Sequence, residues 1–176
     1  MSPRRMISAG LMALFSLSSV ACGRPFKVAT APGFVELEGQ TNDGYAYRST
    51  SPEGVVVAVR VLEDEDRADL GFWTKSITLQ MRDVSGYALL ATRDVTSLDG
   101  TPGKRLELAH DEDGKPYLYW VTVYAAQGKL FIAEAGAPKE LFERAQPSIE
   151  WSMKSLKVKC DTFVSPVLAS RTCNRW

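Results

Sequence analysis

The feature that most limits the fold is a series of strand-like segments joined by turn residues in the second half of the chain. The segments YALLATRDVTS, KRLELAH, YLYWVTVYAA and KLFIAEAG follow one another between residues 87 and 136. Asp-Gly at 113–114 and Gln-Gly at 127–128 stand in the last two connections, where such dipeptides favour tight hairpins. Short connections permit only antiparallel pairing, so this region predicts a four-stranded antiparallel meander.

Three more strand-like segments precede the meander: FVELEG from Phe34, DGYAYRST from Asp43 and GVVVAVRVL from Gly54. The third segment is apolar on both faces, with valines at alternate positions and only Arg60 as a charged residue. A strand that is apolar on both sides is typical of a sheet interior. We therefore expect this strand to be central and covered on both faces.

Two segments change to helical spacing. In the first, apolar residues recur every three or four positions at Leu70, Trp73, Ile77, Met81 and Val84. The acids Glu63–Asp66 precede this helix and suit its N-terminus, and Ser85-Gly86 is expected to end it.

The second helix is expected to begin at Pro138, with a kink or restart at Pro147. Its apolar stripe comprises Phe142, Ala145, Ile149 and Met153. The order of three strands, a helix, four strands and a helix predicts an α+β fold, in which two main helices pack on an antiparallel sheet of six or seven strands.

This arrangement resembles the PsbP-like/DcrB family of small envelope and thylakoid-lumen proteins. The resemblance rests on GFVELEG, GVVVAVRVL, FWTKSI, DGTPGKRLEL, YLYWVTVYAAQGKLFIAEAG and LFERAQPSIEWSMKSLKV, and it covers roughly residues 34–158. These are patterns of turn and core residues rather than chemical signatures. The resemblance implies a PsbP-like domain over residues 34–159 and a non-enzymatic accessory role beside a membrane complex, often as a lipoprotein.

The N-terminus has the layout of a secretory signal: two arginines within the first five residues, then an apolar run that ends at Ala21. Ser19, Val20 and Ala21 before Cys22 resemble the lipobox of bacterial lipoproteins, although Ser19 replaces the usual leucine and Val20 is larger than the common residue. We therefore expect residues 1–21 to be a lipoprotein signal peptide and Cys22 to be lipidated. A plain secreted protein is the alternative.

Lipidation of Cys22 implies a membrane partner, because two or three acyl chains anchor a protein durably. Residues 22–33 would then form the tether. Gly23 stands where aspartate would mark inner-membrane retention, so the resemblance favours the outer membrane, facing the periplasm, in a Gram-negative cell. In a Gram-positive cell the same signal would place the protein outside the plasma membrane.

Two cysteines remain once Cys22 is lipidated, and exported chains meet an oxidising compartment. We expect Cys160 and Cys173 to form a disulfide that closes the tail, residues 160–176. The pair lacks the C-x-x-C spacing of a redox motif. A metal site is not expected either, because the only histidine, His110, is far away in the sequence.

The charge balance argues against nucleic acid as a partner. The chain has 21 basic and 21 acidic residues, and Arg4 and Arg5 would leave with the signal peptide. The mature chain would therefore be slightly acidic, whereas nucleic-acid binding requires a basic footprint.

No catalytic motif is present. The cluster His110-Asp111-Glu112-Asp113 could offer oxygen ligands to a cation, but acids are ordinary residues in an Asp-Gly turn. The acidic run 63–66 lacks the spacing of a calcium loop. A Ser-His-Asp triad would need His110, and no G-x-S-x-G motif accompanies it. We therefore expect neither an enzyme nor a cofactor nor a metal, with a carboxylate-pair hydrolase as the residual alternative.

Aromatic residues give the remaining functional signal. Most are expected in the core, but some could form a surface for a partner or an apolar ligand. The candidates are Tyr45, Tyr47, Tyr117, Tyr119 and Trp120. The leading hypothesis is a membrane-anchored, non-catalytic binding or accessory module for an envelope complex, with an envelope protein as its partner. The alternative is a carrier of a small apolar or lipid-like ligand.

Overall fold

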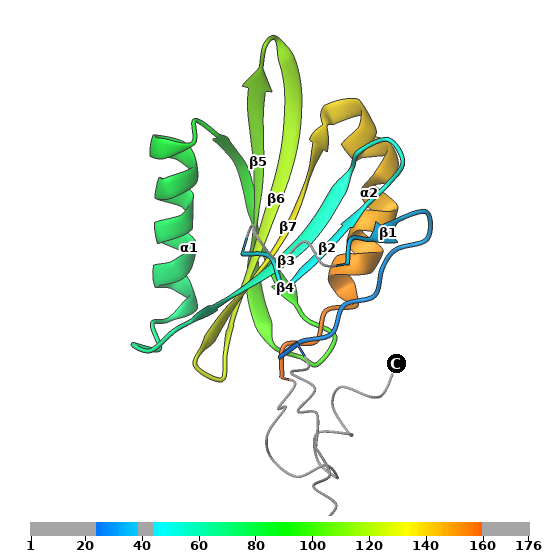
Figure 1. The fold of residues 1–176 in the computed structure, drawn as a ribbon. Helices are drawn as coiled ribbons and strands as arrows, with labels where there is room; N and C mark the ends of the chain where they lie inside the picture. Colours follow the sequence, from blue (N-terminus) through cyan, green and yellow to red (C-terminus); the bar gives the residue numbers. More distant parts are fainter. Residues whose placement is uncertain (1–23, 39–43, 160–176) are drawn as a thin grey trace, which may run out of the picture.

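A computed structural model describes residues 24–38 and 44–159. Its strands form one antiparallel sheet in the order β1-β2-β3-β7-β6-β5-β4 (Figure 1). The helices are α1 (Leu70–Leu79), which continues as the π-helical turn η2 (Gln80–Val84), and α2 (Lys139–Lys154). The strands are β1 (Val35–Glu36), β2 (Tyr47–Thr50), β3 (Val56–Glu63), β4 (Ala88–Thr96), β5 (Pro102–Glu112), β6 (Lys115–Ala126) and β7 (Lys129–Pro138). This arrangement confirms the predicted α+β class and the element order.

Two left-handed turns set the register of the long meander. Asp113 and Gly114 have φ angles of 53° and 75°, and Gln127 and Gly128 have φ angles of 54° and 69°. Positive φ at both central residues is the geometry of a type I′ turn, whose twist matches that of the flanking strands. The predicted hairpins at both dipeptides are therefore confirmed.

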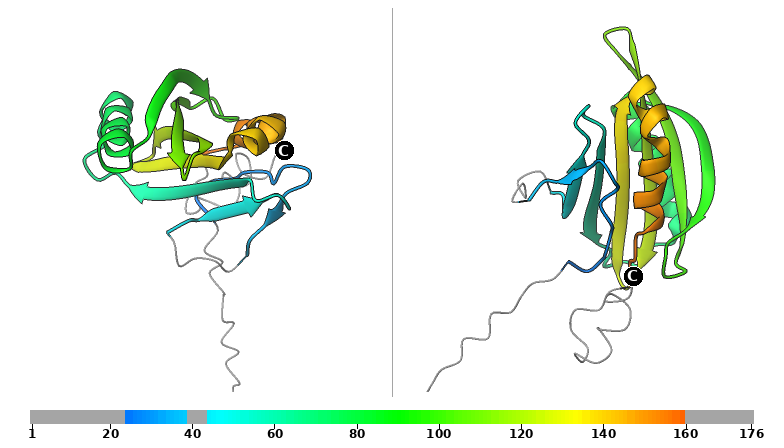
Figure 2. Two further views of the ribbon diagram at one scale, coloured as in Figure 1. Left: turned by 90° about the horizontal axis from the view of Figure 1, so that it is seen from above. Right: turned by 90° about the vertical axis from the view of Figure 1, so that its right-hand side faces the viewer.

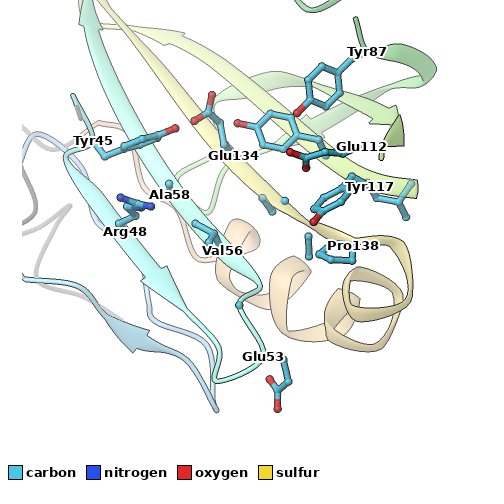
Figure 3. Close-up of a pocket in the computed structure, with 16 residues that line it drawn as sticks. Tyr45, Arg48, Glu53, Val56, Ala58, Tyr87, Glu112, Tyr117, Glu134 and Pro138 are labelled. Carbon is cyan, nitrogen blue, oxygen red and sulfur yellow. The ribbon is translucent and has the colours of Figure 1, made fainter. Parts of the chain in front are cut away.

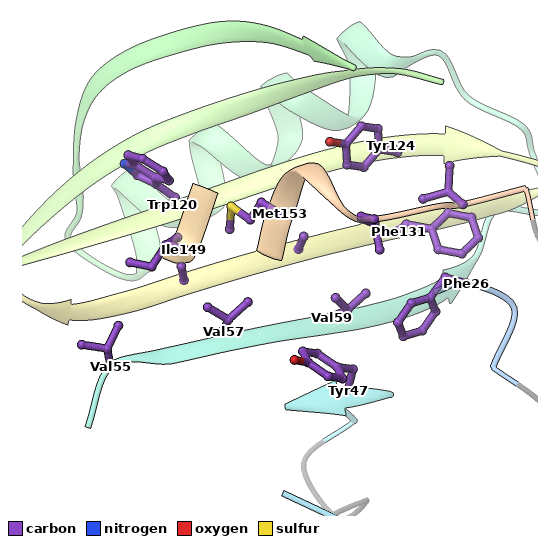
Figure 4. Close-up of a cluster of buried hydrophobic side chains, with 14 of the residues drawn as sticks. Phe26, Tyr47, Val55, Val57, Val59, Trp120, Tyr124, Phe131, Ile149 and Met153 are labelled. Carbon is purple, nitrogen blue, oxygen red and sulfur yellow. The ribbon is translucent and has the colours of Figure 1, made fainter. Parts of the chain in front are cut away.

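The sheet separates the two helices, which lie against opposite faces (Figure 2). On one face, Phe142 and Ile149 of α2 pack over Val57, Trp120 and other residues that alternate along β3, β6 and β7 (Figure 4). The Trp120 and Phe142 rings meet edge to face, with centroids 5.0 Å apart. On the other face, α1 packs on a smaller cluster that consists of Leu106, Leu108, Val121, Val123, Leu130 and Ile132.

Strand β3 is interior to the sheet, as predicted, but it is not covered on both faces. Val57 and Val59 are buried under α2. The opposite face of β3 carries Val56 and Arg60, which are only partly buried, and Leu62, which is 46% exposed. This correction has a simple cause: α1 contacts β5 and β6 and does not extend over β3.

Helix α1 begins at Asp69, whose carboxylate accepts a hydrogen bond from Phe72 N at 2.7 Å. The acidic run before it therefore does not provide the N-cap, although Asp64 is buried and accepts a hydrogen bond from Ala68 N. The apolar stripe is correct as far as Met81. Val84 is 72% exposed, because the π-helical turn adds a residue and rotates the last positions away from the sheet.

Helix α2 follows directly from β7, with Pro138 at the N-cap position. It continues through Pro147 as one element, so the expected restart does not occur. Proline removes one backbone hydrogen bond, but the buried side chains of Phe142 and Ile149 hold both halves of the helix on the sheet.

Within the described ranges, no helix is long and apolar enough to cross a membrane.

Both ends of the described chain lie at the same end of the domain (Figure 1). Phe26 is buried, and Lys27 pairs with Lys157 in an isolated antiparallel bridge. The packed domain therefore begins at Phe26, inside the stretch 22–33 that the sequence assigned to the tether. The proposed lipidation site Cys22 and the proposed disulfide, Cys160 with Cys173, lie outside the described residues.

Candidate functional site

The half of the sheet that α1 leaves open contains a pocket of about 510 Å³. Its floor is formed by β3 and β7, which contribute Val56, Ala58 and Gly136. Figure 3 shows Tyr45 on one side of this floor and Tyr87 with Tyr117 on the other. We call this site the tyrosine pocket and define it by Tyr45, Tyr87, Tyr117, Tyr119 and Glu134.

Tyr119 and Tyr87 line one side of the pocket, and their row of rings continues to His110 outside it. The Tyr87 ring lies 5.5 Å from the Tyr119 ring and 4.9 Å from the His110 ring, between centroids. Tyr87 follows the π-helical turn, and Gly86 before it has a φ of 72°, which returns the chain to the sheet. The end of α1 thus delivers Tyr87 onto the side chains of β5 and β6.

A glycine on β7 makes room for the Tyr119 ring at one end of this row. Tyr119 on β6 is the cross-strand partner of Gly136. A Cβ atom at Gly136 would lie 2.6 Å from Cδ2 of Tyr119, far inside van der Waals contact. Gly136 therefore allows the Tyr119 ring to lie flat across the neighbouring strand and to form part of the pocket floor.

An ion pair closes the pocket beneath Tyr45. The Arg60 guanidinium donates from Nε and Nη2 to the Glu134 carboxylate at distances of 2.9–3.1 Å, and Nη2 also lies 2.8 Å from the Tyr45 hydroxyl. The guanidinium carbon is 4.5 Å from the Tyr45 ring centroid, within cation–π range. The Glu134 side chain is 10% exposed, so bidentate pairing satisfies a nearly buried charge.

The environment of Tyr45, Tyr87 and Tyr119 favours the protonated form of each phenol. Burial, followed by the negative charge of Glu134, raises the pKa of both Tyr119 and Tyr45 above the ordinary tyrosine value. Burial and then Glu112 raise the pKa of Tyr87 in the same direction. At neutral pH these side chains are hydrogen-bonding aromatic surfaces rather than nucleophiles or general bases.

The structure separates the five aromatic residues that the sequence singled out. Tyr45, Tyr117 and Tyr119 come together in the tyrosine pocket. Tyr47 and Trp120 lie on the opposite face of the sheet, buried in the core under α2. The two sets do not form one surface.

The acidic clusters are placed in ordinary structural positions. Asp111 accepts a hydrogen bond from Gly114 N at 2.8 Å and so stabilises the β5–β6 turn. His110 Nδ1 lies 3.4 Å from the Gly86 carbonyl oxygen. Within residues 24–38 and 44–159, no group of three or more His, Cys, Asp or Glu side chains is placed to hold a metal ion.

Sequence reasoning missed Tyr87, Arg60 and Glu134 as members of the site. A signal was present for the last two: Arg60 is the only charged residue of GVVVAVRVL, and Glu134 is the only charged residue of LFIAEAG. Opposite charges in two apolar strands are expected to pair when the strands are neighbours. The sequence did not say that β3 and β7 are neighbours, because their pairing spans the whole meander.

Comparison with known proteins identifies the fold. No protein-family model matches the sequence, and no curated protein matches it either. Among solved structures, cyanobacterial PsbP (CyanoP) from Synechocystis has a TM-score of 0.51 at 13% identity, over 78% of this chain and 95% of that chain. The chain has the PsbP-like fold.

Two further structures share this PsbP-like fold at low identity. LpqN of Mycobacterium tuberculosis, described as involved in cell envelope biogenesis, has a TM-score of 0.60 at 10% identity, over 75% of this chain and 82% of that chain. The Ran-binding protein Mog1p of Saccharomyces cerevisiae has a TM-score of 0.55 at 12% identity, over 77% of this chain and 90% of that chain. At these identities the likeness shows a shared PsbP-like fold.

Proposed function

We propose that this protein is a membrane-anchored, non-catalytic accessory module of the cell envelope that binds a partner protein through the tyrosine pocket. The observation that carries the proposal is the pocket itself. It combines partly buried phenol rings with the satisfied Arg60–Glu134 pair on a sheet face that α1 leaves open. Tyrosine rings offer large contact area at low entropic cost, which is why they are favoured at protein interfaces.

The composition of the pocket supports a polar partner surface. Its lining includes Arg48, Glu53 and Glu112 beside the tyrosines. Glu53 and Glu112 are exposed at the rim, where charged groups guide association more than they add affinity. An apolar ligand held in the tyrosine pocket itself would require enclosed apolar walls, so these charges favour a protein partner over an apolar ligand at this site.

The shared fold supports the same class of role. LpqN is described as acting in cell envelope biogenesis, and Mog1p is described as Ran-binding. Both descriptions concern cellular partners or processes rather than a reaction. We infer that the PsbP-like fold serves here, too, as a scaffold for an interaction surface.

The anchor and the tail belong to this proposal. Lipidated Cys22 would hold the domain at the membrane, and a Cys160–Cys173 disulfide would close the tail. Only a few residues separate Cys22 from the buried Phe26. At about 3.3–3.6 Å per extended residue, the domain would stay within roughly 15 Å of the lipid surface. Outer-membrane attachment facing the periplasm is the proposed location in a Gram-negative cell.

Site-specific photo-cross-linking in cells tests the proposal. A photoreactive residue replaces Tyr117 in the pocket, and a matched control replaces Trp151, an aromatic residue that is 49% exposed on α2. We expect one envelope protein to be cross-linked from position 117 and not from position 151, and the product to be lost with Cys22→Ala. Equal products from both positions, or none from position 117, would refute the pocket as the contact surface.

The anchor is tested separately by intact mass. Wild-type protein purified from the membrane fraction should carry the mass of a diacylglycerol at Cys22, and Cys22→Ala should appear unmodified in the soluble envelope fraction. An unmodified wild-type protein would refute the anchor without bearing on the pocket.

A further inference from the structure

A second pocket, of about 440 Å³, lies on the opposite face of the sheet between α2 and the strands β4 and β5. Helix α2 packs on β6 and β7 and leaves this half of the face open, as α1 does on the other side. Its apolar walls come from Leu90, Leu118, Trp120 and Phe142. Leu90 is 60% exposed, so the pocket opens at the β4 edge of the sheet.

Arg105 lies in this pocket in an unusual environment. Its side chain extends from the middle of β5, and the residue is only 8% exposed. The guanidinium lies over the Trp120 ring at 4.3 Å. Its hydrogen-bond partners are weak: the Thr122 hydroxyl at 3.4 Å from Nε and the Met153 sulfur at 3.7 Å from Nη2. A guanidinium has five N–H donors, so most of its capacity remains unused.

The residue opposite Arg105 on the neighbouring strand is also positively charged. Arg93 on β4 is directly opposite Arg105 in the register. Like charges in this position repel each other. Burial is the largest influence on Arg105 and lowers its pKa, and Tyr124, Glu150 and Glu107, which favour the charged form, do not offset it. The Arg105 guanidinium therefore carries its charge in a place that is poorly solvated.

The carboxylates around the pocket are held by other groups. Glu107 accepts a hydrogen bond from Arg93, and Glu150 accepts hydrogen bonds from Gln146 and Lys154 at 3.2 Å. Among the ion pairs of the described residues, none joins a carboxylate to Arg105 within 4.0 Å. A buried charge without a close partner is costly, and such a charge beside a pocket indicates that a ligand supplies the counterion.

We propose that this pocket binds the carboxylate of an amphipathic molecule, with its head on Arg105 and its apolar chain along Leu118, Trp120 and Phe142. A guanidinium presents two parallel N–H groups that match a carboxylate. The acids in the lining, Glu107 and Glu150 among them, repel any anion, and they repel a doubly charged phosphate more strongly than a singly charged carboxylate. The site lies on the face opposite the tyrosine pocket and does not depend on the proposed function.

Calorimetric titration of the purified full-length protein with decanoate, below its micellar concentration, tests this inference. We expect one decanoate per chain, and at least a tenfold loss of affinity in Arg105→Gln. Arg82→Gln removes an exposed guanidinium from η2 on the α1 side of the sheet and is the matched control, which should bind decanoate as the wild type does. Decanol, which has the same chain without the charge, should bind both the wild type and Arg105→Gln equally weakly.

Three outcomes would overturn the inference: no decanoate binding, equal affinity in wild type and Arg105→Gln, or an equal loss of affinity in Arg82→Gln. Tighter binding of decyl phosphate than of decanoate would refute the carboxylate assignment. If Arg105→Gln does not fold, two measurements on the wild-type protein test the inference in its place. Decanoate must then bind at least tenfold more tightly than decanol and must shift the NMR signal of the Arg105 Nε–H group.

Discussion

Gly136→Ala tests whether the tyrosine pocket depends on the close contact between the backbone of Gly136 and the ring of Tyr119. The added Cβ would lie 2.6 Å from Cδ2 and 3.0 Å from Cε2 of Tyr119, whereas ordinary contacts begin near 3.4 Å. Either the ring or strand β7 must move by nearly an ångström. Overpacking of this kind costs about 1–3 kcal/mol.

A second, smaller effect acts in the opposite direction. Alanine is favoured over glycine inside a strand by roughly 0.5–1 kcal/mol, because it loses less backbone entropy on folding. The net loss of unfolding free energy should therefore lie between about 0 and 2.5 kcal/mol, which corresponds to a fall in Tm of at most roughly 10 °C for a domain of this size. Urea unfolding followed by tryptophan fluorescence measures it.

The Tyr119→Ala background separates the two effects. Without the ring, Gly136→Ala should be neutral or should stabilise the domain by up to about 1 kcal/mol. The difference between the two backgrounds is the cost of the ring contact. If Gly136→Ala destabilises both backgrounds equally, the close approach to Tyr119 is not the reason for glycine at this position.

Three further predictions concern the polar groups. Asp99 accepts hydrogen bonds from Val158 N and Lys159 N at 2.7 and 2.8 Å. Asp99→Ala should therefore lower the unfolding free energy measured in urea by roughly 2–3 kcal/mol, and a loss below about 0.5 kcal/mol would contradict this role. Burial opposes ionisation of Asp99, but its hydrogen bonds outweigh burial and hold its pKa below the ordinary value. The stabilisation by ionised Asp99 should thus be complete above about pH 4 and should disappear as the pH falls through its folded-state pKa. If the wild type instead keeps the same stability advantage over Asp99→Asn down to about pH 2, this prediction is refuted. Arg60→Ala should destabilise the domain more than Glu134→Ala. The first variant leaves the nearly buried Glu134 carboxylate unpaired, whereas in the second the more exposed Arg60 can turn to water. Chemical denaturation that gives the reverse order would refute this asymmetry.

Much of the fold could be predicted because its signals are local. The type I′ turns require positive φ at two consecutive residues, and Asp113-Gly114 and Gln127-Gly128 supply residues that tolerate it. Apolar alternation then fixes which side chains face the core, as for Val121 and Val123 beneath α1. The stripe of α1 was predicted as far as Met81, and it failed at Val84 because a π-helical turn leaves no clear pattern in a single sequence.

The candidate site could be predicted only in part. The sequence singled out Tyr45, Tyr117 and Tyr119 together with Tyr47 and Trp120, but it could not divide them between the two faces of the sheet. That division depends on strand order and on which half of each face a helix covers.

The sequence by itself determined the elements, the hairpins and the α+β class, since these follow from turn chemistry and hydrophobic periodicity over a few residues. Only the tertiary structure decided that β3 lies beside β7, which brings Arg60 to Glu134. It also decided that each helix covers half of a face, leaving the tyrosine pocket on one side and Arg105 in a pocket on the other. These features join residues far apart in the chain, and their energies exist only once the sheet has formed.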